Sequence, residues 1–117
     1  MQVSKRKVNK ILDNEISKIF YQLITDIKSP DEAKEVLGCL LSDTEVVVMI
    51  KRLAVGYWLT KKRSYGVISE NLKISSATVA SIARDLKKPG WKMAIKKVLA
   101  DEWATKWEGK IQKILKR

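Results

Sequence analysis

The segment from Ser64 to Lys87, SYGVISENLKISSATVASIARDLK, constrains the fold more than any other part of the chain. Its apolar residues have helical spacing on both sides of Ile74, so it predicts two short helices joined by a tight turn. Ser64 and Ser75 are expected to cap these helices, because a serine hydroxyl accepts hydrogen bonds from backbone amides of the first turn. The positions that such a unit buries are Ile68, Leu72, Ile74, Val79 and Ile82.

The turn makes two demands on the sequence. Lys73 is expected to adopt a left-handed backbone, a conformation that glycine favours and that costs another residue about 1 kcal/mol. Ser69 is small, as the close approach of two helices requires.

The outer face of the second helix carries small, hydroxyl-bearing and finally basic side chains. A helix with such a face can enter the major groove of DNA. The candidates for contact with base edges are Ser75, Ser76, Ala77, Ala80, Ser81 and Arg84. Arg84 is the one long side chain among them and can pair bidentately with guanine, although a surface salt bridge is an equal alternative. The candidates for contact with phosphates are Ser64, Tyr65, Lys73, Thr78, Lys87 and Lys88.

Positive charge is concentrated in the half of the chain that contains this segment. The chain carries 24 Lys and Arg against 13 Asp and Glu, a net charge of +11. Residues 1–50 hold 7 basic and 8 acidic side chains, a net of −1, whereas residues 51–117 hold 17 basic and 5 acidic, a net of +12. Lys-rich helices also serve as solvated faces, but here charge and motif coincide, which favours double-stranded DNA as the partner.

Apolar spacings of three and four recur along the rest of the chain, and Gly and Pro number only 5 and 2. The sequence therefore predicts one all-α domain over residues 1–117 with about six helices. A first helix over residues 8–27 has a wide apolar stripe that needs a large partner surface. Ser29 and Ser42, each followed by Glu three residues later, predict the next two helix starts. The helix from Asp43 to about Thr60 is apolar over much of its circumference and is expected to be central. Its expected buried positions are Val46, Met49, Ile50, Leu53, Val55, Tyr57, Trp58 and Leu59.

The two ends of the chain are basic. Residues 1–7 are expected to form a flexible basic arm. Lys88-Pro89-Gly90 is expected to end the second helix of the Ser64–Lys87 segment. Residues 91–117 then predict a C-terminal amphipathic helix that carries three of the four Trp on its apolar stripe, and Gly109 permits a break near its end.

Several residue types that catalysis and metal binding use are scarce. The chain has no His, which removes the commonest general base and metal ligand. Cys39 stands alone in an apolar run and is expected to be a buried structural thiol. With no Gly-rich phosphate loop and no metal-ligand cluster, we predict no catalytic, metal or cofactor-binding residue and no enzyme activity. The absence of a signal peptide or a long apolar span predicts a cytoplasmic protein that does not enter a membrane.

Residues about 40–87 resemble the Trp repressor superfamily, especially its short Trp repressor-like members. The residues that carry the resemblance are LLSDTE at 40–45, Lys51-Arg52-Leu53 in the long helix, and the segment from Ser64 to Leu86. The order of elements agrees over roughly residues 8–108. The resemblance implies an all-helical, intertwined homodimer that binds operator DNA through paired recognition helices.

The resemblance also implies a difference in ligand binding. In the Trp repressor, an Arg from the third helix and an Arg-Gly pair in the recognition helix hold the tryptophan corepressor. The first Arg matches Arg52 here, but the pair falls on Ser81 and Ile82. Ser81 lacks the charge that pairs with a ligand carboxylate, and Ile82 fills space that glycine leaves open. Tryptophan binding is therefore not expected, and Arg52 is expected to be structural or to face phosphate.

These observations predict a repressor-like, sequence-specific DNA-binding transcriptional regulator that acts as a homodimer. Two alternatives stay open. One is a protein-interaction module whose Trp-rich basic helix over residues 91–117 docks on an acidic partner or an anionic membrane surface. The other is a promoter-recognition domain similar to those of sigma factors, which shares the helix-turn-helix but lacks the long apolar first helix.

Overall fold

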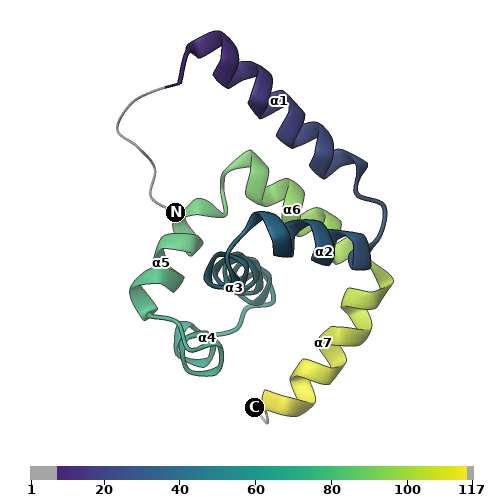
Figure 1. The fold of residues 1–117 in the computed structure, drawn as a ribbon. Helices are drawn as coiled ribbons and strands as arrows, with labels where there is room; N and C mark the ends of the chain where they lie inside the picture. The colour runs from purple at the N-terminus through teal and green to yellow at the C-terminus, as the bar shows by residue number, and fades with distance from the viewer. Residues whose placement is uncertain (1–7, 116–117) are drawn as a thin grey trace. The chain divides into compact units, whose positions relative to one another are not determined.

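The computed structural model describes residues 8–115, and for residues 102–105 it describes the backbone alone. Within that range the chain consists of seven helices and no strand, which confirms the all-α prediction (Figure 1). The helices are α1 (Lys10–Asp26), α2 (Pro30–Leu40), α3 (Asp43–Thr60), α4 (Tyr65–Leu72), α5 (Ser76–Asp85), α6 (Pro89–Ala100) and α7 (Glu102–Leu115). The predicted basic arm at residues 1–7 lies outside the described residues. The helices form two compact units that divide after Asp43.

The first unit contains α1 and α2, and side chains cap both helices. Asn9 accepts hydrogen bonds from the backbone amides of Ile11 and Leu12 at the start of α1. Ser29 accepts from the amide of Glu32 at 3.1 Å, as the sequence predicts. The Glu32 carboxylate accepts from the amide of Lys28 at 2.7 Å, so the capping box closes one residue earlier than its usual form.

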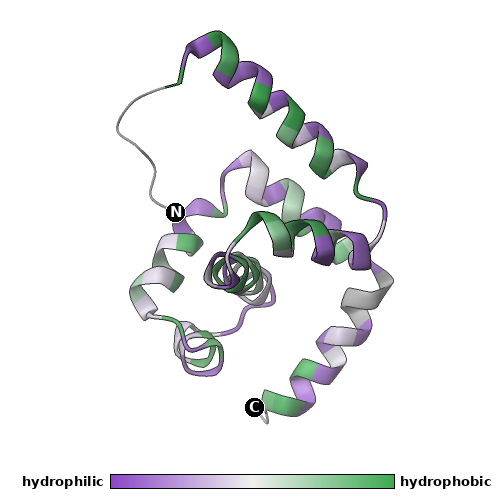
Figure 2. Ribbon diagram, viewed as in Figure 1, coloured by the Kyte–Doolittle hydropathy of each residue, from purple (hydrophilic) through white to green (hydrophobic). Residues whose placement is uncertain are grey.

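Neither helix of the first unit contains a buried residue. Figure 2 shows apolar residues repeating along α1, and this stripe is exposed, with Ile11 at 76% and Ile19 at 68%. Cys39 in α2 is exposed as well, so the expectation of a buried structural thiol is wrong. That expectation rested on the apolar neighbours of Cys39 in the sequence, and the described residues of the first unit do not bury them in a core.

The second unit, residues 44–117, contains the buried core. Tyr57 and Trp58 of α3 contribute its largest side chains, at 2% and 6% exposure. Gly56 directly precedes them, and a Cβ atom at this position would overlap the indole ring of Trp91 on α6. The absence of a side chain at Gly56 therefore lets α6 lie close to α3. The other buried members of the core are Val55, Ile68, Val79, Ile82, Ile95 and Ile111.

Helix α3 has the predicted bounds, but its burial is uneven. Its C-terminal half supplies the core, whereas Met49, Ile50 and Leu53, which the sequence predicts to be buried, are 55%, 63% and 41% exposed. Helix α3 therefore carries more apolar side chains than the described residues bury. After Thr60 the chain turns through Lys62, which has a left-handed backbone with φ 65°.

The C-terminal region forms two helices where the sequence predicts one over residues 91–117. The chain breaks at Asp101, which has an extended backbone with ψ 123°, and Gly109 lies inside α7. Pro89 begins α6 at its first turn, a position where its missing amide hydrogen has no cost. Residues 116 and 117 of the predicted helix lie outside the described residues. The break explains why the described residues form seven helices where the sequence predicts about six.

Helix α7 is attached to the end of α3 through aromatic and charged side chains. The rings of Tyr57 and Trp107 stack with their centroids 5.6 Å apart. The guanidinium group of Arg63 lies 5.0 Å from the ring centroid of Trp58 and donates hydrogen bonds to the carboxylate of Glu108. These contacts join α7 to the loop that leads into α4.

Candidate nucleic-acid interface

Helices α4 and α5 pack on each other as a helix-turn-helix, as the sequence predicts. Ser64 caps α4 by accepting a hydrogen bond from the amide of Val67 at 3.2 Å. Ser75 caps α5 by accepting from the amide of Thr78 at 3.1 Å. The five predicted inward residues all face the core: Ile68, Val79 and Ile82 are fully buried, and Leu72 and Ile74 pack against them partly buried.

The turn between the helices has the strained backbone that the sequence predicts. Lys73 has φ 53° and ψ 55°, within the left-handed region. Its amide donates to the carbonyl of Ser69, and the amide of Ile74 donates to the same oxygen at 3.2 Å. The turn therefore has a fixed backbone path from α4 into α5.

Two side chains hold this turn in a way that sequence reasoning missed. The Ser69 hydroxyl donates to the carbonyl of Ile74 at 2.6 Å, so this residue ties α4 to the turn in addition to being small. The ammonium group of Lys51, on α3, donates to the carbonyl of Lys73 at 3.5 Å. The expected left-handed backbone at Lys73 was a signal for the hydrogen bond from Ser69, because the carbonyl groups beside such a residue need hydrogen-bond donors. No local signal points to Lys51, which lies 22 residues away.

The predicted base-contact residues separate into two groups. Ser75, Ser76 and Ala77 at the N-terminus of α5 are exposed, and so is Arg84 in its last turn. Ala80 and Ser81 between them are partly buried. The exposed face of α5 is therefore small at its N-terminal end and basic at its C-terminal end. The assignment of these six residues to base contacts stays a prediction.

Five of the six predicted phosphate-contact residues flank α5 in the sequence, and Thr78 lies within it. Ser64, Tyr65, Lys73, Lys87 and Lys88 are exposed. Thr78 is partly buried, and its hydroxyl lies 2.9 Å from that of Ser75.

Besides Lys73 in the turn, two of these six residues have structural roles as well. The ammonium group of Lys88 lies 3.3 Å from the carboxylate of Asp85, an ion pair at the surface in which Asp85 is partly buried and which contributes little to stability. Ser64 is the cap of α4. The contacts of all six with DNA stay predictions.

Arg52 and Ile82, which the sequence analysis linked to ligand binding, have different environments. Ile82 is fully buried in the core, and Ser81 beside it is partly buried. Arg52 is exposed and lines an open pocket of about 490 Å³ together with Lys88 and Trp91.

The side chains of residues 8–101 and 106–115 include no group of three or more Cys, Asp or Glu able to hold a metal ion. None of the helices in this range has the length and apolar character needed to cross a membrane.

A family model described as "Trp repressor protein" matches residues 15–99, which run from within α1 to within α6 and include the whole helix-turn-helix. No curated protein matches the chain, and no solved structure matches it. Because the matched range covers more than half of the chain and contains α4, the turn and α5, the chain belongs to the Trp repressor family of DNA-binding transcription regulators.

Proposed function

We propose that the protein is a homodimeric, repressor-like regulator that recognises a two-fold symmetric DNA site with α5 in the major groove. The observation that supports this proposal most directly is the exposed N-terminal face of α5, presented by a turn that Ser69 and Lys51 fix. The surrounding half of the chain has a net charge of +12, which favours association with the phosphate backbone.

The proposed recognition combines few base contacts with many backbone contacts. Ser76 and Ala77 are too short to span a groove unless the helix approaches closely, and Arg84 is the one long candidate on this face. Sequence preference then depends on Arg84 and on the shape and deformability of the DNA. Phosphate contacts from Tyr65, Lys73 and Lys87 fix the register of the helix on the duplex.

The exposed apolar surface of α1 supports the dimer. Eight large apolar side chains of this region are between 37% and 76% exposed: Val8, Ile11, Leu12, Ile16, Ile19, Phe20, Leu23 and Ile24. Burying such a stripe stabilises an assembly by roughly 25 cal/mol per Å² of apolar surface removed from water. A second copy presents the same stripe and the same exposed Met49 and Ile50. Two copies would then place their α5 helices about 34 Å apart, one turn of DNA.

We propose that tryptophan is not the effector of this protein. Ser81 provides no charge for a ligand carboxylate, and the Ile82 side chain occupies the core. Calorimetric titration with tryptophan tests this point, and saturable binding would contradict it.

The test of the proposed function is selection of bound sequences from random DNA, combined with measurement of the mass of the protein in solution. We expect one enriched, two-fold symmetric sequence and a mass of twice the chain. Sequence-blind binding that competitor DNA removes would contradict specific regulation, and a monomeric mass would contradict the dimer.

A second candidate function rests on α7, which lies outside the range that the family model matches. Its exposed residues Lys106, Lys110 and Lys113 lie three and four positions apart, a spacing that puts them on one face. This face suits an acidic protein partner. Changing all three to Gln tests the idea without disturbing the buried Ile111: loss of a partner with DNA binding intact favours an interaction module.

A further inference from the structure

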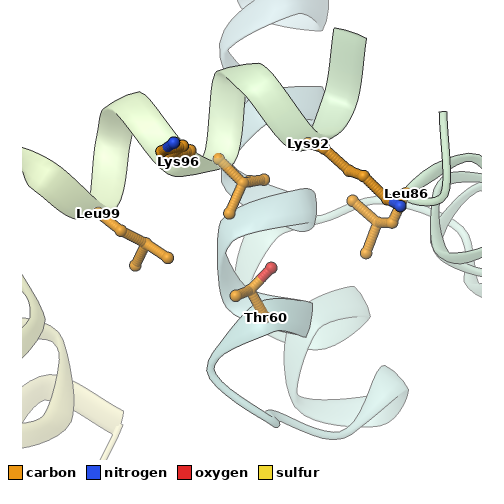
Figure 3. A pocket seen from close by; sticks show the side chains of 6 residues that line it. Thr60, Leu86, Lys92, Lys96 and Leu99 are labelled. Carbon is orange, nitrogen blue, oxygen red and sulfur yellow. The ribbon is translucent and has the colours of Figure 1, made fainter. Parts of the chain in front are cut away.

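An open pocket of about 390 Å³ lies in the second unit where α3, the end of α5 and α6 meet (Figure 3). Its volume is within the range of about 300–1,000 Å³ that is usual for small-molecule sites. The residues that line it are Thr60, Leu86, Lys92, Ile95, Lys96 and Leu99. Figure 3 shows Thr60 and Leu99 directed toward the space between α3 and α6, and Lys92 extending toward Leu86.

The inner part of this pocket is apolar. Ile95 is 8% exposed and Leu86 is partly buried, so both belong to the wall of the core. Leu99 is 41% exposed, which leaves apolar surface in contact with water. The hydroxyl of Thr60 donates to the carbonyl of Gly56 at 2.9 Å, so its donor is already used within α3. An occupant of this part therefore gains most from an apolar group.

The rim of the pocket is cationic. Lys92 and Lys96 lie one helical turn apart on α6, and both are exposed. Among the described side chains, none that lines the pocket is acidic. In the part of the chain that the structure describes, neither ammonium group forms an ion pair. Two adjacent ammonium groups beside an apolar floor complement a molecule with an apolar tail and one negative charge.

We propose that this pocket binds an amphipathic organic carboxylate of medium chain length. The tail lies on Leu86, Ile95 and Leu99, and the carboxylate lies between Lys92 and Lys96. At about 30 Å³ for a water-sized group, the pocket of about 390 Å³ holds roughly thirteen such groups, which limits the length of the ligand. The site contains neither Arg52 nor positions 81 and 82, so it differs from the site that binds tryptophan in the resembling repressor.

The position of the pocket links it to the recognition helix. Leu86 is the C-cap of α5, while the other lining residues belong to α3 and α6. A ligand in the pocket touches all three elements at once. The proposal concerns binding alone, so it stands or fails independently of the proposed function.

The experiment is a titration of the full chain with decanoate below its micelle concentration, followed by calorimetry and by backbone amide NMR. We expect saturation at one site and signal changes concentrated at Leu86 and residues 92–99. Acetate, which lacks the tail, and decyltrimethylammonium, which reverses the charge, are the comparison ligands, and neither is expected to saturate the site. Equal binding of decyltrimethylammonium would overturn the proposal, because the charge of the rim would then play no part.

Two variants and one matched control complete the test. The double change Lys92→Gln/Lys96→Gln is expected to weaken decanoate binding by about tenfold or more, since it removes both charge-assisted contacts. Leu99→Gln, at an exposed position, is expected to weaken it by about tenfold by removing apolar contact. Lys106→Gln/Lys110→Gln on α7 removes the same charge outside the pocket and should leave binding unchanged. If this control weakens binding as much as the rim variant, decanoate responds only to net charge and the proposal is wrong.

Discussion

The guanidinium group of Arg63 and the carboxylate of Glu108 form a bidentate ion pair between residues 45 positions apart in the sequence. Both side chains are largely buried, at 8% and 14% exposure. Burial raises the pKa of Glu108, but hydrogen bonds from Arg63 and Tyr57 and the charges of Arg63 and Lys61 lower it below its ordinary value. Burial raises the pKa of Tyr57, and the hydrogen bond to Glu108 and the charge of its carboxylate raise it further. Arg63, Glu108 and Tyr57 together therefore join α7 to the core.

We expect Glu108→Ala to lower the free energy of unfolding by about 3 kcal/mol, because it leaves the Arg63 guanidinium buried without its partner. Urea unfolding measures this change. Glu15→Ala is the matched control, since Glu15 pairs with Lys18 at 3.5 Å on an exposed surface, and it should cost less than about 1 kcal/mol. Equal effects of the two changes would show that the Arg63–Glu108 pair does not anchor α7.

The lowered pKa of Glu108 predicts a pH dependence of stability. A carboxylate whose pKa is depressed by folding contributes stability above its unfolded pKa, about 4.3, and this contribution is lost as pH falls through the folded value. The difference in unfolding free energy between the wild type and Glu108→Gln should therefore be constant near neutral pH and shrink below about pH 4. Urea unfolding of both proteins from pH 7 to pH 2 measures it. A difference that does not change with pH would contradict the assignment.

The left-handed backbone of Lys73 predicts a stabilising substitution. Lys73→Gly should raise the free energy of unfolding by up to about 1 kcal/mol, because glycine adopts this conformation without the steric cost of a Cβ atom. Thermal unfolding measures the change. Lys97→Gly, at an exposed position inside α6, should instead destabilise by about 1 kcal/mol. A destabilising Lys73→Gly would mean that the side chain stabilises the turn by more than its strain costs.

The sequence was most informative where structure depends on neighbouring residues. The caps at Ser29, Ser64 and Ser75 and the strain at Lys73 each depend on a few adjacent positions, and all were predicted correctly. The contact of Ser69 with Ile74 also joins residues only five positions apart, but a serine can be small, cap or donate, and spacing alone does not choose among these roles.

Features that depend on distant residues were not predictable. Lys51 reaches Lys73 across the fold, and no pattern around either residue indicates it. The exposure of Cys39 and Met49 depends on which surfaces meet, and apolar spacing alone does not give that. The break at Asp101 was missed because the apolar spacing continues through it. Its one local signal is Asp101 itself, since Asp favours the position before a helix start and α7 begins at Glu102.

Arg84 and Lys87 provide the sharpest test of the DNA interface, because the proposal gives them different roles. Arg84→Ala should cost about 1–3 kcal/mol on the selected DNA sequence and relax the preference at a single base pair. Lys87→Gln should weaken binding to all sequences alike and reduce the slope of log affinity against log salt by about one. Fluorescence anisotropy at several salt concentrations, with the selected sequence and a scrambled one, separates the two effects. If Arg84→Ala weakens both sequences equally, Arg84 contacts the backbone, and sequence preference must come from the shape of the DNA against the small residues at the start of α5.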